Sequence, residues 1–203
     1  SSLMEVFQNQ CDKETIFIGQ KNIGINLRST PATYLDISDT IRKLFAQANH
    51  SNIQQFSFNS KGGCPACGGK GVIVSDMAFM ESIETVCDVC HGTRYNAEVL
   101  EYKYKGKNIA EVMGLSVEEA IAFFEGQPFQ PQLQALAKVG LGYLHLNQTM
   151  TTLSGGELQR VKLASYLHRK GEIFIIDEPT ANLDYGNSFR VMQRIETLGA
   201  AGY

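Results

Sequence analysis

The sequence predicts an α/β fold in which pieces of a parallel-sheet domain are separated by a large helical, cysteine-bearing insertion. Three observations predict it. Residues 15–19 (TIFIG) and 172–176 (EIFII) are short apolar runs, and a continuous apolar run is typical of a buried parallel strand. Helical periodicity flanks the second run on both sides. Four of the five cysteines form two CxxC pairs in the stretch between the runs.

The first helix is expected after a polar loop that runs from the first strand to about Tyr34. Asp36 or Ser38 would open this helix, and apolar side chains then recur at helical spacing, at Ile41, Leu44, Phe45 and Ala48. Residues 57–95 hold the two CxxC pairs among several glycines. Two short helices follow from Asn108, and Ser116 with Glu119 forms a capping box for the second.

The remainder of the chain predicts a helix, a strand and a second helix. Residues 126–150 are less periodic, and Ser154 then opens a longer helix with an apolar stripe of Leu158, Val161, Ala164 and Leu167. The strand at 172–176 follows. The final helix has one apolar face and ends near Gly199; that face consists of Phe189, Met192, Ile195 and Leu198.

Composition narrows the functional classes. The chain has 203 residues and a formal net charge of −3, so no global basic field draws it to nucleic acid, and any such contact requires a local patch. No apolar run reaches the length of a membrane span, and the N-terminus lacks a signal-peptide pattern. An odd number of cysteines without such a signal favours a reducing compartment, the cytoplasm, and metal binding over disulfides.

The two CxxC pairs predict a metal site. Cys64 with Cys67 and Cys87 with Cys90 are separated by nineteen residues, a spacing at which four thiolates can close a tetrahedral zinc site. The neighbouring glycines suit tight knuckle turns. A pair of redox CxxC motifs is the alternative, and it fits the glycine-rich knuckles poorly. His91 adjoins Cys90 and could compete as a ligand, but with four cysteines available it is expected at the surface or beside the site.

A second set of residues points to phosphate chemistry. Ser154, Gly155, Gly156 and Glu157 begin a helix whose first amides are free to bind an anion such as phosphate. The alternative is an ordinary capping box. Farther along, the apolar strand runs into Asp177 and Glu178, where a carboxylate can hold magnesium and another can polarise a water molecule. The alternative there is a pair of solvated acids.

These residues resemble the motifs of ABC-type ATPases. Residues 153–160 are similar to the signature motif, 173–178 to the Walker B strand, and 182–184 to the D-loop. The resemblance implies that Glu178 is the catalytic base. It also implies that nucleotide and magnesium are bound by Gln20, which matches the Q-loop glutamine, together with Ser154, Gly155, Gly156, Glu157, Asp177 and Asp184.

A zinc module between a Q-loop and a signature motif resembles the UvrA family, the damage-recognition ATPases of bacterial nucleotide excision repair. The resemblance extends from about residue 15 to 185 and is closest to the C-terminal ATPase half; it includes residues 28–34, 56–59, 94–96, 104–109 and 139–144. It implies a partial ABC ATPase core with an inserted helical signature subdomain that carries the zinc module.

The same resemblance implies domain limits, cofactors and partners. Residues 1–35 would be core with the Q-loop, 36–150 the signature subdomain with zinc at about 57–107, and 151–203 the signature helix, Walker B strand and D-loop. Zinc, ATP and magnesium are the implied cofactors. The implied partners are double-stranded DNA, a second ATPase half or homodimer partner, and a repair nuclease, with no membrane.

The sequence departs from the family at three places. It has no GxxxxGK followed by Ser or Thr, and no switch histidine, so it is expected to be an internal piece whose isolated form hydrolyses ATP slowly or not at all. The D-loop reads Asn182-Leu183-Asp184, where the repair proteins usually have Gly-Leu-His. This difference favours an alternative, a UvrA-like paralogue with a role such as drug resistance and purely structural zinc. A zinc-ribbon interaction domain with a vestigial ATPase is a third reading, which Asp177 and Glu178 argue against.

The sequence also bears on contact with DNA. Residues 94–107 are mildly basic and interleaved with tyrosines, a pattern that can follow a nucleic-acid backbone. The basic residues are Arg94, Lys103, Lys105 and Lys107. From 61 to 107, however, six basic residues are balanced by six acidic ones, and such stretches are more often solvated hairpins. The family resemblance favours contact with duplex DNA through its deformability.

Overall fold

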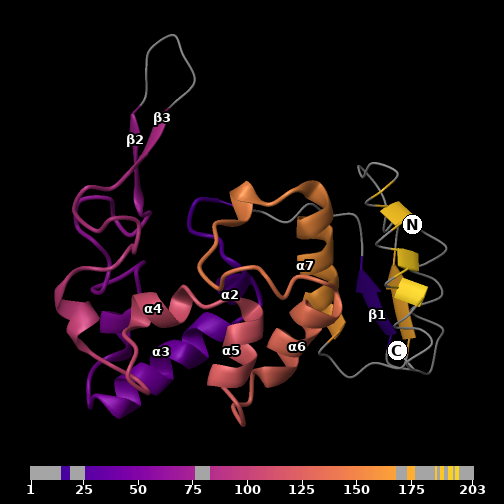
Figure 1. Ribbon diagram of the computed structural model, residues 1–203, viewed down its shortest axis with the longest axis horizontal. Helices are drawn as coiled ribbons and strands as arrows, with labels where there is room; N and C mark the ends of the chain where they lie inside the picture. The colour runs from indigo at the N-terminus through magenta and orange to yellow at the C-terminus, as the bar shows by residue number, and fades with distance from the viewer. Residues whose placement is uncertain are drawn as a thin grey trace. The chain divides into compact units, whose positions relative to one another are not determined.

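The computed structural model describes residues 15–18, 26–75, 83–167 and 173–176, with a few further positions between 186 and 196 (Figure 1). These residues form two compact units. The cysteine unit comprises 26–116 and 145–149, and the helix unit comprises 117–144 and 150–167 with the strands near both ends of the chain. Within the described ranges, no helix combines the length and the apolar composition that a membrane crossing requires.

The cysteine unit is built on helix α3, Ile37–Ala48. Ile37, Ile41 and Phe45 are fully buried and lie four residues apart, so they form one apolar stripe. Ala48, predicted to belong to this stripe, is exposed at the last turn. Asp36 occupies the N-cap position with a left-handed φ of 58°, and the structure gives its side chain no capping bond.

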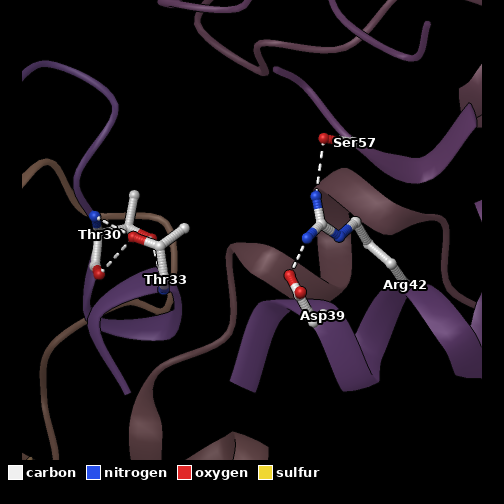
Figure 2. A network of polar contacts seen from close by, with 5 residues as sticks. All are labelled: Thr30, Thr33, Asp39, Arg42 and Ser57. Atoms are coloured by element: carbon white, nitrogen blue, oxygen red, sulfur yellow. Dashed lines mark hydrogen bonds and ion pairs between the residues drawn. The ribbon is translucent and has the colours of Figure 1, made fainter. Parts of the chain in front are cut away.

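Polar contacts fix the start of this unit, as Figure 2 shows. Thr30 and Thr33 form a reciprocal capping box around the short helix α2, Pro31–Tyr34, in a segment predicted to be a loop. Arg42 on α3 pairs with Asp39 one turn earlier, and its Nη1 donates to Ser57 Oγ at 2.7 Å. The arginine thereby joins α3 to the chain just after the 3-10 helix η1, Ile53–Phe56.

The rest of the cysteine unit consists of short elements. They are β2 (Val72–Ser75), β3 (Ile83–Val86), the 3-10 helix η2 (Glu98–Glu101) and α4 (Ile109–Met113). The strands β2 and β3 pair antiparallel, with Val72 opposite Val86 and Ser75 opposite Ile83. This hairpin extends away from α3 and α4 (Figure 1), and all four residues of β3 are exposed. It therefore gains little from hydrophobic burial.

The helix unit contains both strands that the sequence predicts, and the structure pairs them in parallel. Strand β1 (Thr15–Ile18) lies beside β4 (Ile173–Ile176), with Thr15 opposite Ile173, although the two are far apart in sequence. Helices α5 (Val117–Phe123), α6 (Gln130–Lys138) and α7 (Gly155–Leu167) pack in that order. The 3-10 helix η3, Met150–Thr152, precedes α7. The predicted last helix falls mostly outside the described residues.

Helix α7 is buried around most of its circumference. Of the predicted stripe, Val161, Ala164 and Leu167 are buried and Leu158 is half-buried, but residues on the other sides of the helix are buried too, including Lys162 and Ser165. Such a helix is surrounded by other elements and does not lie on a surface. Its N-terminal turn differs, because Ser154 and Gly155 remain exposed.

Candidate functional site

The structure brings the four predicted cysteines together. All are buried, and their Sγ atoms lie within 4.8 Å of one another. The Sγ atoms of Cys64 and Cys87 are 4.0 Å apart, and those of Cys67 and Cys90 are 3.7 Å apart. A disulfide requires about 2.05 Å, whereas a tetrahedral zinc ion with bonds of about 2.3 Å holds its sulfur ligands about 3.8 Å apart. The cluster is therefore compatible with zinc.

Backbone turns position the first cysteine pair. The amides of Gly69 and Lys70 donate to the carbonyl oxygens of Cys64 and Cys67, both at 3.2 Å. The amide of Gly71 donates to Cys67 Sγ, also at 3.2 Å, and such a bond stabilises a thiolate. Gly69 has a φ of +74°, and a Cβ built there would lie 1.8 Å from the carbonyl oxygen of Phe58. Only glycine fits this knuckle.

The second pair has a matching turn. The amide of His91 donates to the carbonyl oxygen of Cys87 at 2.8 Å, and the amide of Cys87 donates to Gly71 in the first knuckle at 3.0 Å. A hydrogen bond from the backbone of Cys90 lowers the pKa of Cys87 to about 7, whereas burial raises the pKa of Cys90 to about 12. His91 itself is exposed, as expected for a residue that is not a ligand.

Arg94, predicted as a DNA contact, is buried at 5% exposure. Its guanidinium lies 5.3 Å from the ring centroid of Phe58, and Nη2 donates to Thr149 Oγ1 at 2.5 Å. Its carbonyl oxygen accepts from the amide of Cys64 at 2.8 Å. Burial lowers its pKa. Arg94 therefore supports the cysteine cluster from within the unit, and its charge does not face solvent.

The other residues of the 94–107 segment divide into core and surface. Tyr95 is buried edge-on against Phe58, with ring centroids 5.9 Å apart. Tyr102 packs edge-on against Phe56 with ring centroids 5.5 Å apart, and Tyr104 lies tilted against Phe45 with centroids 5.7 Å apart. The interleaved aromatic rings therefore pack against the hydrophobic core. Lys103 and Lys105 are exposed and Lys107 is half-buried, around a tight turn between Tyr104 and Lys107.

The N-terminus of α7 contains the capping box that the sequence offered as the alternative to a phosphate site. Ser154 donates to Glu157 Oε2 from its amide at 2.8 Å and from its hydroxyl at 2.9 Å, and the amide of Glu157 donates to Ser154 Oγ at 3.3 Å. The structure adds a residue that the sequence argument did not single out. The hydroxyl of Tyr143 donates to Glu157 Oε1 at 2.5 Å, so both carboxylate oxygens are engaged.

Arg160 ties the same turn to the loop that carries Tyr143. Its Nε donates to the carbonyl oxygen of Gly156 at 3.2 Å, and its Nη1 lies 3.4 and 3.3 Å from those of Val139 and Gly140. Burial raises the pKa of Glu157, but the hydrogen bonds from Tyr143 and Ser154 and the charge of Arg160 outweigh it, so that pKa lies below its ordinary value. Glu157 is therefore ionised at neutral pH.

Several predicted site residues lie outside the described part of the chain. They are Gln20, Asp177, Glu178 and Asp184, and the lone Cys11 is a further one. Gly155 and Gly156 are described, and they form the first turn of α7. Of the predicted sites, the structure thus describes the cysteine cluster, the first turn of α7 and the 94–107 segment.

Comparison with known proteins gives consistent results. A family model described as "ABC transporter" matches residues 74–181, just over half of the chain. The chain is 48% identical over 196 residues to UvrABC system protein A of Listeria monocytogenes, and 50% identical over 204 residues to that of Staphylococcus epidermidis. These matches cover 90% and 94% of the chain, but 20% and 22% of the relatives.

A solved structure agrees with these matches. The crystal structure of UvrA2 from Deinococcus radiodurans superposes with a TM-score of 0.81 and 39% sequence identity. The match covers 98% of this chain and 27% of that one. The chain thus spans about a fifth of the length of the curated relatives cited above.

Proposed function

This chain belongs to the ABC family of ATPases and, within it, to the UvrA family or a close paralogue, and on that premise we propose that its protein binds damaged DNA in an ATP-dependent step of nucleotide excision repair. In this proposal the described residues belong to the C-terminal ATPase half. They supply the signature helix and a zinc module, and the DNA duplex and a second ATPase half are the partners.

The first turn of α7 is the observation that carries the ATP-dependent part of the proposal. Ser154 and Gly155 are exposed there, at the positive end of a helix of 13 residues. The amide of Glu157 bonds Ser154, but the amides of Gly155 and Gly156, which no side chain blocks, and the serine hydroxyl together suit a phosphate. In ABC ATPases the signature helix serves the nucleotide held by the opposite half. We therefore assign α7 to an ATP site completed across a half-site interface.

The remaining roles are assigned by position in the sequence. Asp177 would hold magnesium, Glu178 would polarise the attacking water, and Gln20 would sense magnesium and the γ-phosphate. Asp184 would lie in the D-loop beside the interface. Four thiolates fit a structural zinc ion, which would cross-link the two knuckles and fix the hairpin between them.

Replacing Ser154 with alanine is expected to lower kcat for ATP hydrolysis by the complete protein at least roughly tenfold, because a hydrogen bond to an ionised phosphate is removed from the closed state. The KM for ATP should change little, since the opposite half holds the nucleotide before closure. Steady-state kinetics measure both. Unchanged kcat in the Ser154→Ala protein would refute the half-site assignment of α7.

The lysines around the Tyr104–Lys107 turn are proposed to bind DNA phosphates. The slope of log affinity against log salt is negative. Replacing Lys103, Lys105 and Lys107 with glutamine should make it shallower, by about 0.9 for each phosphate that a lysine no longer neutralises. Fluorescence anisotropy with a duplex at several salt concentrations measures the slope. Lys138→Gln, on the exposed surface of α6, is the matched control and should leave it unchanged. An unaltered slope in the triple variant would exclude this turn from the DNA interface.

The D-loop favours a second candidate function. Asn182-Leu183-Asp184 departs from the Gly-Leu-His that the repair proteins usually have, so a UvrA-like paralogue with a role such as drug resistance is the alternative. Binding of the complete protein to damaged and undamaged duplex separates the two. Tighter binding to damaged duplex that persists as salt rises supports repair, and equal, weak binding to both supports the paralogue.

A further inference from the structure

Tyr143 is placed to control the signature turn without belonging to the signature motif. It lies in the loop between α6 and α7, and its side chain is 55% exposed, so packing alone does not fix it. Its hydroxyl is fixed by one described bond, donated to Glu157 Oε1 at 2.5 Å. Burial and the adjacent carboxylate raise the pKa of Tyr143, so the phenol keeps the proton that it donates.

The loop itself is held by backbone bonds. The amides of Val117 and Glu118 donate to the carbonyl oxygens of Leu144 and Gly142, at 2.9 and 3.1 Å. Arg160 holds the earlier part of the loop from the second turn of α7. The phenol of Tyr143 is therefore a fixed donor, aimed from a rigid backbone at a carboxylate on the neighbouring helix.

The capping box poses a problem for phosphate binding. A hydroxyl has one proton, and that of Ser154 is donated to Glu157 Oε2. To donate to a phosphate, Ser154 must release this bond. On Oε2, the Glu157 carboxylate would then keep only the bond from the Ser154 amide. Without a second partner on Oε1, the carboxylate could swing over the first turn of α7, where its charge would repel the phosphate.

We propose that Tyr143 is a positioning residue that holds the Glu157 carboxylate beside α7 while the Ser154 hydroxyl turns to the phosphate. With Oε1 bound to the phenol and Oε2 to the Ser154 amide, the carboxylate stays in its capping position when the serine leaves. The negative charge then remains off the axis along which the phosphate approaches. This inference rests on the proposed ATP site at α7.

The test compares variants of the complete protein. Tyr143→Phe keeps the ring and removes only the donor, and it should lower kcat roughly tenfold, the lower end of what a hydrogen bond to an ionised group contributes. The KM for ATP should stay within about twofold, because the opposite half binds the nucleotide first. Tyr102→Phe removes a phenol hydroxyl from the cysteine unit and should leave kcat unchanged.

A double-variant cycle shows whether Tyr143 acts through the charge of Glu157. In the Glu157→Gln background there is no negative charge to hold aside, so adding Tyr143→Phe should change kcat by less than about twofold. A reduction as large as in the wild-type background would mean that the Tyr143 hydroxyl acts by a route other than the charge of Glu157, and would overturn the proposal. Circular dichroism of each variant allows kcat to be expressed per folded molecule.

The Ser154→Ala variant distinguishes failure of this inference from failure of the proposed function. If Ser154→Ala slows turnover and Tyr143→Phe does not, the signature site stands and the positioning role is wrong. If neither slows turnover, the ATP site at α7 is itself wrong, and the positioning role falls with it.

Discussion

Replacing Cys87 with serine is expected to abolish stoichiometric zinc binding and to unfold the two cysteine knuckles with the β2–β3 hairpin between them. The four sulfurs lie within 4.8 Å of one another, and Cys87 is 1% exposed. Little else holds the hairpin between the knuckles, because every residue of β3 is exposed and a two-stranded hairpin is marginal in water. Structural zinc contributes about 10–16 kcal/mol in zinc-finger peptides, far more than the hairpin itself gains.

Elemental analysis and thiol titration of the purified chain measure this effect. The wild-type chain should carry about one zinc ion, with Cys11 as its reactive thiol, and the variant should carry much less. His91→Asn is the matched control, since His91 adjoins Cys90 at a φ of 48° and asparagine tolerates that backbone conformation. It should retain its zinc. A wild-type chain that is free of metal and has CxxC disulfides would rule out the zinc module.

The sequence predicts the cysteine cluster well because ligand spacing directly reflects coordination geometry. Two residues between the cysteines of each pair allow a tight knuckle, and the structure confirms that the four thiols meet. The capping box of Ser154 and Glu157 is similarly local; the sequence offered it as the alternative to a phosphate site, and the structure contains it. Local patterns of this kind involve neighbours in the chain, so no knowledge of the rest of the fold is needed.

Arg94 and Tyr143 show where sequence reasoning fails. A count of charges cannot reveal that Arg94 is buried over Phe58, because this contact depends on packing between segments 36 residues apart. The contact from Tyr143 to Glu157 likewise joins a loop to a helix 14 residues later. Helix α6 was not predicted because its sequence is rich in glutamine, and its buried side, Leu133 and Leu136, is short. Such features follow from tertiary packing.

Gly69→Ala is expected to destabilise the cysteine unit by about 3 kcal/mol or more, through backbone strain and a steric clash. Its φ is +74°, and an added Cβ would lie 1.8 Å from the carbonyl oxygen of Phe58 and 2.8 Å from its carbonyl carbon. The Phe58 backbone cannot move freely, because the ring is 6% exposed and is packed against Arg94 and Tyr95.

Gly106→Ala separates the strain from the clash, since both glycines lie in the cysteine unit. Gly106 has a φ of +82°, but among the described atoms nothing lies within 4 Å of an added Cβ. Gly106→Ala should therefore lower the free energy of unfolding only through left-handed backbone strain, by about 1–2 kcal/mol. Urea denaturation of the zinc-loaded chain gives both free energies, and a competition titration with a chelator shows whether Gly69→Ala also weakens zinc binding. Equal destabilisation by the two variants would mean that the Phe58 carbonyl yields, and that the knuckle requires only the glycine conformation.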